Sequence, residues 1–151
     1  MSLRCPRTIE EFLAPPTREQ WLAALRMGWP GPDGSSSSTD TIFGVRIGIT
    51  SAKHEHASLP ANLHDWRYLL GRTFRLGEEY RQAADDAHPW DLWAACYAEL
   101  TGWRTALLPA AWARCWTRWA VLRSAGWWSF TAKQKEIQLA WHGDLRTTVI
   151  V

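Results

Sequence analysis

The chain has 151 residues, of which 46% are hydrophobic, and its formal net charge is +2. This length favours one domain, and the composition favours a folded core over a disordered chain. The small net charge gives no indication of nucleic-acid binding, and no run of about 18 uncharged apolar residues predicts a membrane-spanning helix. Met1 is followed by no apolar signal segment, and Cys5, Cys96 and Cys115 are too widely spaced to predict a disulfide framework.

Residues 1–34 are predicted to form an N-terminal helical arm. Within this arm, Thr17 and Gln20 have the spacing of a capping box, which begins a helix that runs to about Met27. A shorter helix is predicted upstream, over residues 8–13. A Ser-rich linker at 35–40 separates the arm from the predicted main domain, 41–151.

Alternating apolar residues predict β-structure at two places in the main domain. Ile42, Val45, Ile47 and Ile49 alternate within a predicted short strand at 41–49, where two glycines weaken the pattern. A C-terminal β-hairpin is also predicted. Its strands would be 137–141 and 145–151, on either side of a turn at 142–144.

The rest of the main domain has apolar residues at helical spacing, so the predicted fold is mainly α. An antiparallel pair of helices is expected at 59–75 and 78–88, with the turn at Gly77 and an end at Pro89. Two Trp-rich helices should follow, at 90–103 and at 110–124, the second ending at Gly126.

Four residues of the predicted helical pair have side chains suited to acid–base chemistry. On a helix, His64 and Tyr68 share one face, while Asp65 points about 100° round from His64. The second helix can return a carboxylate beside His64 and orient its ring. Spacing of the apolar residues places Asp86 somewhat nearer the inward face than Asp85, so local geometry alone leaves both open.

The sequence His-Asp-x-x-Tyr at His64, followed about twenty residues later by Asp, resembles the active-site core of phospholipase A2, most closely the prokaryotic and fungal branch. It is similar also to a bacteriophage-borne family of unknown function with a His-Asp-Trp-x-Tyr motif. The resemblance implies that His64 is the general base and that Asp65 binds calcium. It implies further that Asp85, and not Asp86, holds the His64 ring and accepts a hydrogen bond from Tyr68.

Two other patterns have a functional and an ordinary interpretation. His54 and His56 alternate as zinc or copper ligands would, but a polar exposed loop explains them more simply. Trp112, Trp116 and Trp119 form a stripe that suits a lipid interface or, as we favour, the core face of an amphipathic helix. The segment 127–130, Trp-Trp-Ser-Phe, is the better candidate for a contact surface.

These observations lead to two hypotheses about function. The first is a structural protein of a virion or similar assembly, built on a phospholipase A2-like scaffold and located in the virion or the bacterial cytoplasm. Its partners would be other proteins of the assembly. Unpaired cysteines and the lack of a recognisable Gly-rich calcium loop before His64 favour it. The alternative is a calcium-dependent phospholipid hydrolase that uses His64, Asp85 and Tyr68, with calcium on Asp65.

Overall fold

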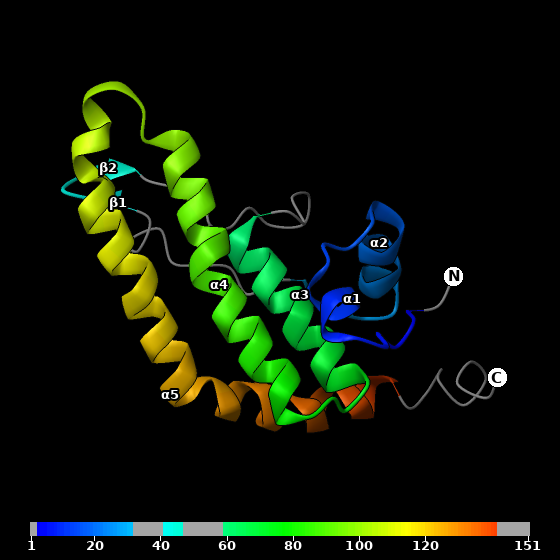
Figure 1. The fold of residues 1–151 in the computed structure, drawn as a ribbon. Coiled ribbons are helices and arrows are strands. Elements are labelled where there is room, and N and C mark those ends of the chain that lie inside the picture. The colour runs from blue at the N-terminus through cyan, green and yellow to red at the C-terminus, as the bar shows by residue number, and fades with distance from the viewer. Residues whose placement is uncertain (1–2, 32–40, 47–58, 142–151) are drawn as a thin grey trace.

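The computed structural model describes residues 3–31, 41–46 and 59–141, and it is mainly helical, as predicted. Figure 1 shows the arrangement of the elements. In chain order they are α1 (Ile9–Leu13), α2 (Arg18–Arg26), β1 (Thr41–Ile42), β2 (Val45–Arg46), α3 (Pro60–Thr73), α4 (Glu78–Glu99), the 3₁₀ helix η2 (Gly102–Leu107) and α5 (Leu108–Trp141).

The first two helices pack against α3 and do not extend away from it. Thr17 caps α2 with the predicted capping box, in which its side chain and that of Gln20 each accept from the other's backbone N–H. Phe12 of α1 and Trp21 of α2 belong to the same buried cluster as Trp66 of α3. The predicted boundary at 35–40 lies outside the described residues, so the division into arm and domain stays a prediction.

Helices α3 and α4 form the expected pair, but α4 does not end at Pro89. It continues to Glu99, with Pro89 buried inside it. A proline inside a helix removes one backbone hydrogen bond and typically costs about 3 kcal/mol. Here the helix buries side chains on both sides of that position, Asp85 and His88 before it and Leu92 and Cys96 after it. This burial provides a reason for the helix to continue.

The last helix, α5, is also longer than predicted, because Gly126 does not end it. The helix descends along α4 and then turns to cross beneath the ends of α3 and α4 (Figure 1). Phe130 lies in this crossing segment and is buried in the main core, where its ring meets Tyr68 edge-on at 5.1 Å. The prediction that 127–130 is a contact surface is therefore wrong for Phe130, although Trp127 is exposed.

Both predicted β-segments differ from the structure. The expected strand at 41–49 begins instead as a tight hairpin, in which Ile42 pairs with Val45. Phe43 and Gly44 form the turn, both with positive φ, as a two-residue hairpin requires. Residues 137–141, predicted as the first strand of the C-terminal hairpin, are helical in α5. The second strand of that hairpin lies outside the described residues.

A second buried cluster joins the far halves of α4 and α5, which extend together beyond α3 (Figure 1). Its members are Leu92, Cys96, Leu100, Ala111 and Cys115. Among the described helices, none is long and apolar enough to cross a membrane.

Candidate functional site

Asp85 of α4 is the centre of a buried polar network between α3 and α4. It is fully buried, and its Oδ1 accepts a hydrogen bond from Tyr68 Oη at 2.6 Å. His64 Nε2 lies 3.2 Å from the same oxygen. Because a carboxylate only accepts, this contact places the proton of a neutral His64 on Nε2 and leaves Nδ1 as the acceptor. The prediction that Asp85 contacts the His64 ring is confirmed.

Arg81 supplies the positive charge that balances Asp85. Its Nη1 donates to Asp85 Oδ2 at 2.6 Å, and its Nε donates to the Glu78 carboxylate at 2.8 Å. Hydrogen bonding to Glu78, and then the charge of Asp85, raise the pKa of the Arg81 guanidinium, while the Arg81 hydrogen bond lowers the pKa of Glu78. A buried carboxylate with a bound guanidinium is far less costly than one alone.

Asp86, the alternative from apolar spacing, is exposed on the other side of α4. Its Oδ1 accepts from Trp119 Nε1 at 2.8 Å, and Arg123 Nε lies 3.8 Å from the same oxygen. Arg81 and His64 both bind Asp85.

Tyr68 stays protonated in this environment. Burial is the main cause that raises the pKa of its phenol, and the hydrogen bond to Asp85 raises it further. The hydroxyl therefore keeps the proton that it donates to Asp85 above the pH at which an ordinary tyrosine ionises.

His88, one turn after Asp85 on α4, stacks beside His64 with ring centroids 4.7 Å apart. Burial is the main cause that lowers the pKa of His88 well below its ordinary value, so its ring is neutral. Its Nδ1 is buried without a hydrogen-bond partner among the described residues. Sequence analysis missed this neighbour, although Arg81, Asp85 and His88 recur at the three- and four-residue steps of one helix face.

Gly126 of α5 covers the network. A Cβ atom at this position would lie 2.5 Å from Tyr68 Oη, 3.3 Å from Arg81 Nη1 and 3.4 Å from Asp85 Oδ2. Only glycine allows α5 to pass this close. His64, which lies at the other oxygen of Asp85, is only 6% exposed.

Asp65, the predicted calcium ligand, is half-buried and lies about 100° round α3 from His64. Within the described ranges, no three His, Cys, Asp or Glu side chains gather as a metal site would require. Calcium prefers six to eight oxygen ligands. The sequence identified a single candidate ligand, the carboxylate of Asp65. Residues 47–58, which include His54 and His56, lie outside the described residues. The described residues therefore do not complete a calcium site.

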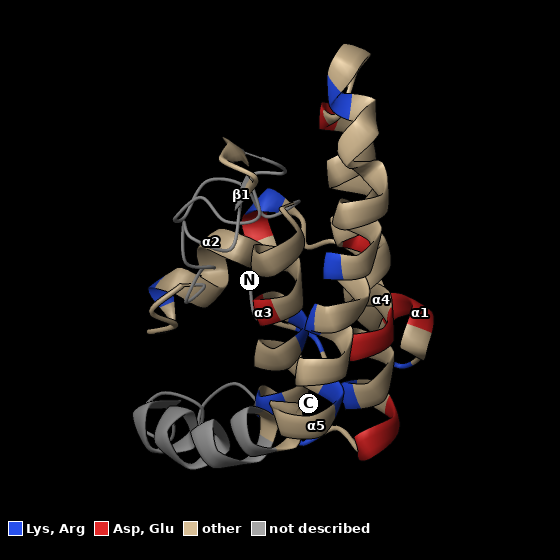
Figure 2. Ribbon diagram, turned by 90° about the vertical axis from the view of Figure 1, so that its left-hand side faces the viewer, with Lys and Arg blue, Asp and Glu red and all other residues tan. Residues whose placement is uncertain are grey.

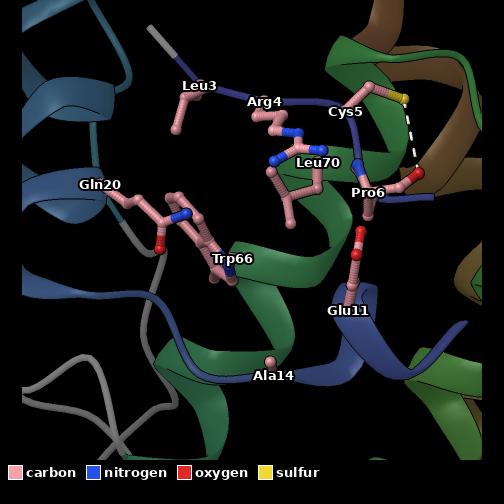
Figure 3. A pocket seen from close by; sticks show the side chains of 9 residues that line it. All are labelled: Leu3, Arg4, Cys5, Pro6, Glu11, Ala14, Gln20, Trp66 and Leu70. Carbon is pink, nitrogen blue, oxygen red and sulfur yellow. Dashed lines mark hydrogen bonds between the residues drawn. The ribbon is translucent and has the colours of Figure 1, made fainter. Parts of the chain in front are cut away.

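A cavity of about 260 Å³ lies on the opposite side of α3 (Figure 3). Trp66 and Leu70 line it from α3, and Arg4, Glu11 and Gln20 line it from the N-terminal segment. Trp66 is about 200° round the helix from His64, so this cavity does not open onto the Asp85 network.

A continuous series of ring contacts, here called the aromatic ladder, runs along one side of the α4–α5 pair. Neighbouring rings in it lie 4.9–5.9 Å apart, mostly edge to face. Its members are Tyr97, Trp93, Trp90, Trp112, Trp116 and Trp119. Tyr97, Trp90 and Trp112 are exposed, Trp90 to 54%. The Trp stripe of α5 is thus not the core face that the sequence favoured.

Comparisons of this chain with protein-family models, with curated proteins and with solved structures find no match.

Proposed function

We propose that this protein is a structural component of an assembly and that the aromatic ladder is the surface through which one copy contacts another. The exposed rings of the ladder carry this proposal. Large aromatic side chains bury much area at little entropic cost, and Tyr and Trp are enriched at protein interfaces. Soluble monomers rarely leave contiguous apolar patches of this kind uncovered.

The distribution of charge supports a second copy as the partner. Between Glu99 and Glu136 the chain has six basic and no acidic residues, which leaves 11 basic and 15 acidic residues in the rest. Figure 2 shows acidic residues on α1, α3 and α4. The basic α5 of one copy is therefore complementary to the acidic α1 and α4 of another, and such complementarity directs association.

The buried network suits a scaffold that holds the ladder in place. His64 is 6% exposed, both oxygens of Asp85 are bound, and Gly126 closes the site from above. Arg81 compensates the negative charge of the buried Asp85 carboxylate. We propose that the network fixes α3, α4 and α5 together. The resemblance of the His64 motif to a bacteriophage-borne family suggests that the assembly is a virion.

Sedimentation velocity tests this proposal. Wild type should sediment as species larger than the 17.3 kDa monomer, in proportions that grow with concentration. Replacing two ladder residues, Trp90→Gln with Trp112→Gln, should shift the protein to monomer. Trp103→Gln is the matched control, because Trp103 is 72% exposed but is not one of the six residues of the aromatic ladder. Unchanged association in the ladder variant would overturn the proposal.

A second candidate is an acyl-ester hydrolase of the phospholipase A2 type, and one observation favours it. Asp85 holds His64 through Nε2, which leaves Nδ1 free to accept a proton from water, while Tyr68 fixes the carboxylate. This is the arrangement that the resemblance implies. In this candidate Asp65 holds calcium, and the helices around His64 must part to admit substrate.

The two candidates differ in an esterase assay with micellar phospholipid and added calcium. Loss of a general base typically lowers the rate about 10²–10⁴-fold, so His64→Ala should abolish hydrolysis by an active enzyme. Wild type that shows no hydrolysis above the His64→Ala background would exclude the hydrolase. Hydrolysis that is lost in His64→Ala would instead assign the network to catalysis.

A further inference from the structure

The cavity between the N-terminal segment and α3 combines an apolar wall with two opposite charges. Trp66 and Leu70 lie one helical turn apart on α3, and together with Leu3 they form the buried apolar wall. Arg4 and Glu11 are exposed residues that line the same cavity. Its volume of about 260 Å³ lies just below the range of about 300–1,000 Å³ of sites for drug-sized ligands, so it suits a smaller molecule.

Two polar side chains of the cavity are held in place by hydrogen bonds that use only part of their capacity. Glu11 Oε2 accepts from the backbone N–H of Arg7 at 2.7 Å, and Gln20 Oε1 accepts from the backbone N–H of Thr17 at 2.8 Å. Among the described residues, none binds the other Glu11 oxygen or the Gln20 amide nitrogen. The cavity therefore offers a fixed carboxylate oxygen as acceptor and a fixed amide group as donor.

Arg4 adds a positive charge to these two groups. Within the described ranges its guanidinium has no hydrogen bond or ion pair. A guanidinium stays charged, and its planar N–H groups match the two oxygens of a carboxylate. Figure 3 shows Arg4, Glu11 and Gln20 around the side chains of Trp66 and Leu70. One cavity thus has a group for a carboxylate, a group for an ammonium and an apolar wall.

We propose that this cavity binds the zwitterion of a free apolar α-amino acid. Arg4 and the Gln20 amide donate to its carboxylate, Glu11 accepts from its ammonium group, and its side chain lies against Trp66 and Leu70. A ligand with only one of the two charges would leave Arg4 or Glu11 without a partner in the complex. The site lies on the opposite side of α3 from the buried network and shares no residue with the aromatic ladder, so it goes beyond the proposed assembly function.

Isothermal titration calorimetry of the full-length protein tests this proposal, with L-phenylalanine and L-leucine as probes. We expect dissociation constants of about 10 μM to 1 mM, as ligands of this small size allow. 3-Phenylpropionate lacks the ammonium group and 2-phenylethylamine lacks the carboxylate. Each should bind about tenfold or more weakly than L-phenylalanine, because one charge-assisted hydrogen bond is lost.

Two substitutions remove the charges of the cavity one at a time. Arg4→Gln and Glu11→Gln should each weaken the binding of L-phenylalanine about tenfold or more. Glutamine at position 11 keeps an oxygen that can accept from Arg7, so the start of α1 is preserved. Arg18→Gln and Glu10→Gln are the matched controls, because they remove the same charges from exposed residues that do not line the cavity. Both controls should bind L-phenylalanine as wild type does.

The unfolding temperature gives a second readout. L-phenylalanine at about 10 mM should raise it in wild type and in both controls, and less in Arg4→Gln and Glu11→Gln, because a ligand stabilises the state that binds it. Three results would overturn the proposal. The first is that neither amino acid binds, and the second is that 3-phenylpropionate or 2-phenylethylamine binds as tightly as L-phenylalanine. The third is equal binding in the cavity variants and their controls, which would place the ligand elsewhere.

Discussion

Replacing Gly126 by alanine tests how closely α5 packs over the buried network. At an exposed helix position this substitution stabilises a protein by about 1 kcal/mol, because alanine is the better helix former. Here the new Cβ would lie 2.5 Å from Tyr68 Oη, a separation at which one of the two groups must move.

Moving the Tyr68 side chain would weaken contacts that stabilise the folded protein. Its hydroxyl donates to Asp85 at 2.6 Å, and its ring rests edge-on against Phe130. A hydrogen bond to a charged group contributes about 1.5–3 kcal/mol, and an overpacked core costs about 1–3 kcal/mol. After the gain in helix propensity, Gly126→Ala should lower the free energy of unfolding by about 1–3 kcal/mol. For a chain of this size, that lowers the unfolding temperature by about 2–10 °C.

A double-mutant cycle with Tyr68→Phe separates the clash from other effects, because phenylalanine lacks the hydroxyl that Cβ would meet. In that background Gly126→Ala should be neutral or stabilising by up to about 1 kcal/mol. Ala120→Gly, at an exposed position of α5, measures helix propensity in the same helix and should cost about 1 kcal/mol. If Gly126→Ala stabilised the protein equally in both backgrounds, the close packing of α5 on Tyr68 would be refuted.

Three further predictions use urea denaturation. Asp85→Asn should lower the free energy of unfolding by about 3–5 kcal/mol, because it leaves Arg81 buried without its charged partner. The control Asp86→Asn changes an exposed residue and should lower it by less than about 1 kcal/mol. Equal losses in the two variants would contradict the burial of Asp85. His88 takes up a proton near pH 6.5 in the unfolded chain but only at lower pH in the folded protein. The free energy of unfolding should therefore fall by up to about 1.4 kcal/mol per pH unit as the pH drops below 6.5. His88→Gln should weaken this slope, and an unchanged slope would show that His88 is not its source. Thr17→Ala should cost about 1 kcal/mol by removing the α2 capping box, and an unchanged stability would contradict a stabilising role for this cap.

The sequence was sufficient to predict the helical pair and the contact between Asp85 and His64. The helix pattern is local, and the spacing of the His64 motif to Asp85, which resembles that of phospholipase A2, identified which of two adjacent aspartates would meet the histidine. Apolar spacing alone favoured Asp86, because it treated Ala83 and Ala87 as part of the inward face. The structure instead turns Arg81, Asp85 and His88 inward. Polar side chains can occupy that face because most of their polar groups bind one another.

Helix ends were harder to predict, because tertiary contacts overrode the usual end signals. Pro89 and Gly126 are typical helix breakers, yet both lie buried inside helices. Gly126 is needed for its small size beside Tyr68, which no local pattern reveals. The shared burial of Cys96 and Cys115 in one cluster was equally invisible, since it depends on how α4 and α5 pair.

The account depends most on whether this chain associates through its exposed aromatic surface. Light scattering of the purified wild-type protein over a series of concentrations measures this directly. We expect a molar mass above 17.3 kDa that increases with concentration. A constant mass of 17.3 kDa over the whole series would contradict the proposed assembly role and leave the aromatic ladder without the function assigned to it.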